Sequence, residues 1–247
     1  MAQYEPLTIG KIVRSESHVR YTCQVYGPGE VAAPPQPSDF AFGSFVRIPL
    51  RIGPTRADLL EFPALPAADV VLFNDEPNGL STGANAWAIG LIYDTILLNP
   101  AFGTLGPRLS NEEQVALFSP DYLTERAVLV SILLLGTMSR GLAGDSPLVS
   151  HGVPPVAPDL GAEVTVLPDG AVRAFHFFAD GAAGPGGPRP YLHMGYLPHA
   201  IAQENPLLPL ALLRTIERLE GLLPENAALL SIVKRNFAWR LKVQTAG

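Results

Sequence analysis

The chain has 247 residues, of which 47% are hydrophobic and 16% charged, and its net charge is −6. So apolar a composition excludes a disordered chain, and the negative balance argues against a generic nucleic-acid binder. The length supports a substantial core. The low charged fraction favours a surface that is partly covered by a partner or a second copy.

The sequence also bears on where the protein works. Residues 1–6 show no basic region followed by an apolar stretch, so we expect no signal peptide. Apolar runs stay short of the roughly 20 residues that a membrane span needs, so we expect no membrane segment. Cys23 is the one cysteine, which precludes an internal disulfide. Together these features predict a cytoplasmic protein.

The N-terminal part of the chain is predicted to form strands joined by loops. Apolar residues alternate with polar ones over residues 19–25, which indicates a half-buried strand, and residues 7–13 form a strand before it. Residues 27–39 hold four prolines and two glycines and are therefore a loop. Residues 45–52 are a third strand, which Pro49 limits to a sheet edge or a bulge.

The middle of the chain mixes strand and helix signals. Residues 70–73 are a short apolar run ended by a polar turn, and residues 88–98 form a long strand. Residues 110–118 begin with the S-x-x-E pattern of a capping box, and Ser119-Pro120 offers a second helix start. Residues 128–135 fit either a helix or a buried strand, and their β-branched residues favour the strand.

The C-terminal part is predicted to change from strands to helices. Residues 164–178, with Asp-Gly at the turn, indicate a hairpin. After a Gly/Pro-rich loop, residues 207–223 and 225–243 form two helices that meet at Pro224 and pack antiparallel. In the second helix, five apolar residues are spaced to share one face. They are Leu229, Leu230, Val233, Phe237 and Leu241.

These elements predict a β-rich α+β fold, with a small β-barrel body followed by a C-terminal helical hairpin. The predicted division is a β-barrel-like domain over residues 1–179 and a Gly/Pro-rich loop over 180–190. Residues 191–247 then form a strand and the helical hairpin.

One segment matches a catalytic motif. Gly79-Leu80-Ser81-Thr82-Gly83 has the G-x-S-x-G form of a nucleophile elbow, which would make Ser81 the nucleophile of a hydrolase. That elbow needs a strand leading in and a helix leading out. Here a polar turn precedes the motif and a strand-like run follows it, so a loop is the favoured interpretation. No catalytic residue is therefore predicted, and the protein is expected not to be an enzyme.

Metal and nucleotide sites are weakly supported. His176, His193, His199 and Glu204 lie within thirty residues, which raises the possibility of zinc. They lack the spacing of a helical ligand pair, and His176 is expected on a strand, so ordinary surface or core histidines are favoured. The sequence contains neither a phosphate-loop motif nor a dinucleotide-binding glycine motif in the right context. We therefore expect no cofactor.

The C-terminal residues collect positive charge. From Glu225 to the end there are four basic residues and one acidic residue. These basic residues, with Phe237 and Trp239 interleaved, could bind nucleic acid through phosphate contacts and base stacking. The alternative is a helix whose basic residues complement its dipole and whose aromatics pack inward. The candidate nucleic-acid-binding residues are Lys234, Arg235, Trp239, Arg240 and Lys242.

The order of the β segments resembles the small barrel shared by HerA-type DNA translocases and rotary ATP synthase subunits, the HAS barrel. The resemblance covers residues 7–178 and is carried by glycine-containing apolar segments at matching places in the order. They are Ile9-Gly10-Lys11-Ile12-Val13, Gly43-Ser44-Phe45-Val46, Ile89-Gly90-Leu91-Ile92-Tyr93, Leu133-Leu134-Leu135-Gly136 and residues 154–164. The ATPase core that follows the barrel in that family is absent, and a helical tail stands in its place.

In that family the barrel holds subunits in a ring or receives a partner such as a NurA-type nuclease. The resemblance therefore implies a non-enzymatic binding or assembly module. Its partner would be a second copy or a HerA-like P-loop ATPase, and the implied setting is DNA repair or other DNA processing. A nucleic-acid-binding protein that uses the basic C-terminal helix, and the Ser81 hydrolase, are the alternatives.

Overall fold

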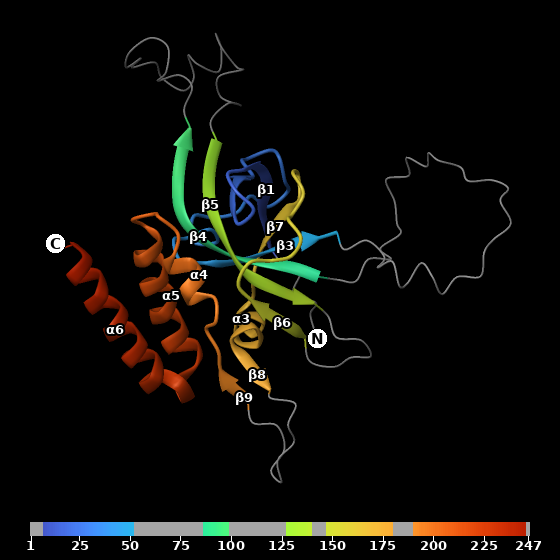
Figure 1. Cartoon of the computed structure of the whole chain (residues 1–247). Coiled ribbons are helices and arrows are strands. Elements are labelled where there is room, and N and C mark those ends of the chain that lie inside the picture. The colour runs from blue at the N-terminus through green and yellow to red at the C-terminus, as the bar shows by residue number, and fades with distance from the viewer. Residues whose placement is uncertain (1–6, 52–85, 99–126, 140–146, 180–189, 246–247) are drawn as a thin grey trace, which may run out of the picture.

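The computed structural model describes residues 7–51, 86–98, 127–139, 147–179 and 190–245 (Figure 1). Several predicted features lie outside the described residues. They are the apolar run at 70–73, the G-x-S-x-G segment with Ser81, the two helix starts between 110 and 120, and the loop at 180–188.

Six antiparallel strands close into a barrel, which confirms the predicted β-rich α+β fold. Around the barrel the strands follow the order β2-β1-β7-β3-β4-β5, and β5 pairs back with β2. A seventh strand, β6, pairs with the C-terminal part of β5, beyond the region that pairs with β2. The strands are β1 (Thr8–Ser15), β2 (Arg20–Val25), β3 (Phe45–Leu50), β4 (Ala86–Leu98), β5 (Ala127–Ser139), β6 (Leu148–His151) and β7 (Glu163–Val166).

The strand sequences account for how each strand is used. The central parts of β4 and β5 are buried at consecutive positions, because one face lines the barrel and helices cover part of the other. In β3, pairing with β7 involves Val46 and Arg47, whereas pairing with β4 runs on to Leu50. Pro49 therefore lies beyond the part of β3 that pairs with β7, and a residue without an N–H is tolerated there.

The hairpin predicted over residues 164–178 is wrong beyond its first strand. The segment that follows β7 is a helix, and its buried side chains, Val172, Phe175 and His176, follow helical spacing. Asp169 lies in the first helical turn, where a carboxylate is favourable. The new elements are α3 (Asp169–His176), β8 (Phe177–Ala179) and β9 (Pro190–Leu192), of which β8 and β9 pair with each other.

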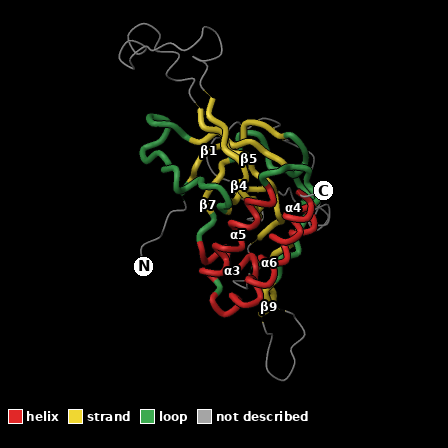
Figure 2. The backbone as a smooth tube through the Cα atoms, turned by 90° about the vertical axis from the view of Figure 1, so that its left-hand side faces the viewer, coloured by secondary structure: helices red, strands yellow, loops and turns green. Residues whose placement is uncertain are grey.

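The chain ends in the predicted helical hairpin. A short 3₁₀ turn, Pro224–Asn226, joins α5 (Leu208–Leu222) to α6 (Ala227–Thr245), and α4 (Leu197–Ile201) precedes both. Figure 1 shows α5 between the barrel and α6, and Figure 2 shows the helices gathered below the strands of the barrel. Buried residues of the barrel and of these helices form one hydrophobic cluster.

The predicted inner face of α6 needs one correction. Leu230 and Phe237 are buried, and Val233 and Leu241 are partly buried against the same cluster, as expected. Leu229 is instead 48% exposed, because a residue adjacent to Leu230 points about 100° away around the helix. Among the helices of the described residues, none is long and apolar enough to cross a membrane.

Candidate binding groove

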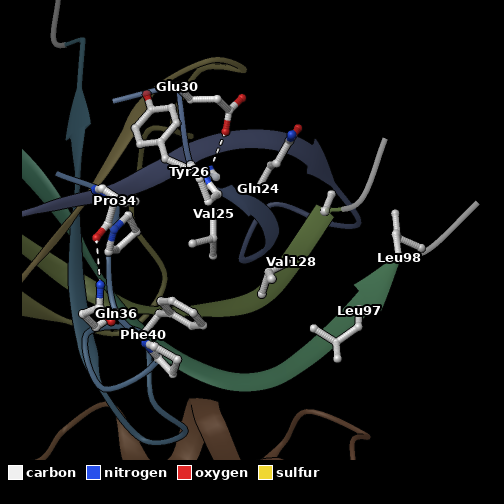
Figure 3. Close-up of a pocket in the computed structure, with 15 residues that line it drawn as sticks. Gln24, Val25, Tyr26, Glu30, Pro34, Gln36, Phe40, Leu97, Leu98 and Val128 are labelled. Atoms are coloured by element: carbon white, nitrogen blue, oxygen red, sulfur yellow. Dashed lines mark hydrogen bonds between the residues drawn. The ribbon is translucent and has the colours of Figure 1, made fainter. Parts of the chain in front are cut away.

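A groove of about 1000 Å³ opens between the proline-rich loop after β2 and the outer ends of β4 and β5 (Figure 3). Its size lies at the upper end of the range of small-ligand pockets. It is lined by the end of β2, the loop over residues 26–40 and the ends of the two long strands. The lining residues used below are Gln24, Tyr26, Phe40, Leu97, Leu98 and Val128.

The groove exists because the start of β5 extends beyond the end of its neighbour β2. Pairing between β2 and β5 finishes at Gln24 and Leu129. Just beyond, the backbone N–H of Tyr26 donates to the carbonyl of Ile9, so the chain stays with β1. Pairing between β4 and β5 continues outward to Leu98 and Ala127. The first residues of β5, Ala127 and Val128, therefore have β4 on one side and the groove on the other.

The loop that forms the opposite wall is held in shape by local bonds. The N–H of Gly27 donates to the carboxylate of Glu30 at 2.6 Å, and the N–H of Gln36 donates to the carboxylate of Asp39 at 2.7 Å. Its prolines, including Pro34 and Pro35, fix their own backbone angles. A wall that is already ordered loses little conformational entropy when a ligand binds.

The surface of the groove is mainly apolar. Leu97 is 75% exposed and Leu98 is also exposed, although both are large aliphatic residues. Figure 3 shows Tyr26 and Phe40 on the wall opposite these leucines. Burial, and then the nearby charge of Glu163, raise the pKa of Tyr26, so its phenol stays neutral and can donate a hydrogen bond. Exposed apolar residues gathered around a concave surface are typical of a binding site.

A second cluster, of histidines and a tyrosine, is structural. His176 lies on α3 and is fully buried. Its Nδ1–H donates to the carbonyl of Val172 at 2.7 Å, because a carbonyl can only accept, and its Nε2 accepts from the hydroxyl of Tyr196 at 2.9 Å. Burial lowers the pKa of His176 to about 4 and raises the pKa of Tyr196, so both groups are neutral at pH 7.

His151 belongs to the same cluster and was not identified from the sequence. Its Nε2–H donates to the carbonyl of Phe175 at 2.9 Å, and its Nδ1 accepts from the N–H of Gly195 at 3.0 Å. Burial is the main cause that lowers the pKa of His151 to about 4. His193 stacks on it with ring centres 4.7 Å apart. The ring nitrogens of His151 and His176 are thus engaged in hydrogen bonds, which leaves them no lone pair for a metal.

The histidine group suggested by the sequence is therefore only partly brought together. The expectation that His176 lies on a strand is wrong. His176 and His193 join His151, whereas Nε2 of His199 bonds the carbonyl of Leu134 on β5 at 3.1 Å. Glu204 lies in the exposed turn after α4. Within the described ranges, the structure has no group of three or more histidine, cysteine or acidic residues that could hold a metal ion.

The candidate nucleic-acid-binding residues lie on α6, and those whose side chains the structure describes face different ways. Lys234 pairs with Glu220 of α5 at 2.5 Å, so its charge is used within the protein. Arg235 is exposed, and Trp239 is 66% exposed, whereas the neighbouring Phe237 is buried. Arg240 and Lys242 belong to the same helix. Of the two aromatics, one packs inward and one does not, so nucleic-acid binding stays a prediction.

Comparison with known protein families gives a match over most of the chain. A family model described as Domain of unknown function (DUF8166) matches residues 2–59 and 78–246 of the chain. No curated protein shows significant similarity to the chain.

Proposed function

The chain belongs to the DUF8166 family, and from the geometry of the groove we propose that it is a non-enzymatic binding or assembly module. The observation that carries the proposal is the exposed apolar surface around Leu97, opposite an ordered proline-rich wall. Such a surface is costly to leave in water, since each exposed large aliphatic side chain forgoes about 1.5–3 kcal/mol of burial. A partner that covers it recovers this free energy.

The proposed occupant of the groove is an extended apolar segment of a partner protein. Before Leu129, β5 is not paired with β2, so its backbone at Ala127 and Val128 borders the groove. An extended segment can lie beside such a strand and exchange main-chain hydrogen bonds with it. Leu97, Leu98 and Phe40 then supply contacts for its side chains, which give specificity.

The proposed partner is a HerA-like ATPase, with a second copy of the chain as the alternative. Support comes from the closed six-stranded barrel, which agrees with the fold expected from the resemblance to HAS barrels. In those proteins the barrel serves docking and assembly. A role in DNA processing follows from this partner and is proposed with it.

Site-specific photo-crosslinking in the source organism tests the proposal. A photoreactive amino acid at position 97 is expected to give a discrete adduct with a second protein, which mass spectrometry then identifies. The matched control carries the same amino acid at Leu160, which is also exposed but lies outside the groove. Adding Phe40→Glu should abolish the adduct from position 97. Absence of any intermolecular adduct, or equal adducts from both positions, would count against the groove.

A further inference from the structure

Helix α6 presents an apolar stripe on its outer face. Ile232 is 54% exposed, and the side chains of Leu229 and Trp239 are exposed to a similar extent. With the exposed Asn236, these residues are spaced three, four and three apart. This is the spacing of the a and d positions of a heptad, which fall along one side of a helix. We call residues 229, 232, 236 and 239 the α6 stripe.

The α6 stripe is separate from the face that holds the helix to the protein. Leu230 and Phe237 supply the buried face, and Lys234 ties α6 to α5 through Glu220. The exposed side of α5 differs, because next to the exposed Leu210 it carries Arg214 and Glu217, which pair with each other. Helix α6 needs one apolar face to pack against the rest of the protein. Its second apolar face can pack against a further helix.

The charges beside the stripe decide what kind of helix fits. Arg235 is exposed and occupies a g position of this heptad, and in the sequence Arg240 occupies the following e position. In a parallel pair with a second copy of α6, these positions would face each other and place like charges together. An antiparallel pair that stacks the stripe on itself about its midpoint would also oppose basic residues, because the Arg235 side chains of the two copies would lie beside each other. A second copy is therefore disfavoured.

We propose that the α6 stripe docks an amphipathic helix of a partner protein whose apolar stripe is flanked by acidic residues. This inference rests on the proposed binding function and assigns that function a second contact surface. Trp239 supplies the large aromatic contact that often dominates a helix interface. Arg235 pairs with an acidic residue at the edge of the interface. Nucleic acid fits the same charge but leaves Leu229 and Ile232 without apolar contacts.

The test uses the full chain and a synthetic probe. The probe is a fluorescent peptide of about three heptads, with leucine at a and d and glutamate at e and g. We expect its anisotropy to report saturable binding. Ile232→Gln and Trp239→Gln should each weaken binding by about tenfold or more. The control Leu210→Gln, an equally exposed residue of α5, should leave binding unchanged, and circular dichroism checks that every variant is folded.

Two further probes distinguish the possible occupants. A peptide with lysine in place of glutamate should bind at least about tenfold more weakly, and a single-stranded DNA oligonucleotide should not displace the acidic peptide. Equal binding of both peptides, or binding that survives Ile232→Gln, overturns the proposal. DNA binding without peptide binding also overturns it, in favour of the nucleic-acid alternative. None of these outcomes changes the crosslink expected from position 97, so the groove and the α6 stripe are tested separately.

Discussion

Replacement of Gly136 by alanine is expected to destabilise the protein by about 3 kcal/mol or more. Gly136 lies on β5 opposite His151 of β6. A Cβ atom there would lie 2.1 Å from the carbonyl oxygen of Ser150 and 3.0 Å from Cα of His151. Both are backbone atoms, so the clash can be relieved only by moving β6 away from β5. That movement also pulls His151 out of its bonds with Phe175 and Gly195.

Urea unfolding followed by circular dichroism measures this effect, and Gly221→Ala is the matched control. Gly221 lies near the end of α5, where an added Cβ meets nothing within 4 Å. Alanine is the better helix former by up to about 1 kcal/mol, so this variant should be as stable as the wild type or more so. If Gly136→Ala unfolds at the same urea concentration as the wild type, the close approach of β5 and β6 is wrong.

The free energy of unfolding is expected to fall by about 2 kcal/mol between pH 7 and pH 5 through His176 alone. In the unfolded chain a histidine takes up a proton near pH 6.5, whereas in the fold burial keeps His176 neutral down to about pH 4. The unfolded state therefore binds more protons throughout this window, and protons favour unfolding. Below about pH 4 the loss levels off, because the folded protein also takes up the proton.

A pair of variants isolates this contribution. His176→Leu combined with Tyr196→Phe removes both partners of the buried hydrogen bond, so no buried polar group loses its partner. The double variant should show a pH dependence that is shallower by about 2 kcal/mol over the same window. Tyr196→Phe alone keeps the buried imidazole and should keep most of the slope. A double variant with the full wild-type slope would contradict the assignment to His176.

The barrel could be predicted from sequence because its signals are local. Alternation over residues 19–25 and the apolar run at 128–135 identify β2 and β5 without knowledge of their partners. The segment that forms α3 shows that local sequence patterns can fit more than one structure. Asp169-Gly170 is a common turn pair, yet Val172, Phe175 and His176 also fit helical spacing, and burial against the barrel favours the helix.

The histidine cluster and the groove depend on contacts between distant parts of the chain, which sequence patterns do not reveal. His151 meets Phe175 and Gly195, which lie 24 and 44 residues further along the chain. The groove arises because β5 begins two residues before its pairing with β2 starts, an offset that only the paired barrel defines. The α6 stripe was not predicted, because the sequence pattern placed Leu229 on the inner face of the helix. Its outward direction became clear only when Leu230 and Phe237 were found to be buried against the core.

The most direct test of the binding role is the mass of the native assembly. The full chain, expressed at its endogenous level in the source organism, would be purified under non-denaturing conditions. It would then be analysed by native mass spectrometry over a range of salt concentrations. A binding module predicts a defined species heavier than the 26.4 kDa chain, with a stoichiometric partner that Phe40→Glu in the groove releases. A single species at the mass of one chain under every salt condition would contradict the account.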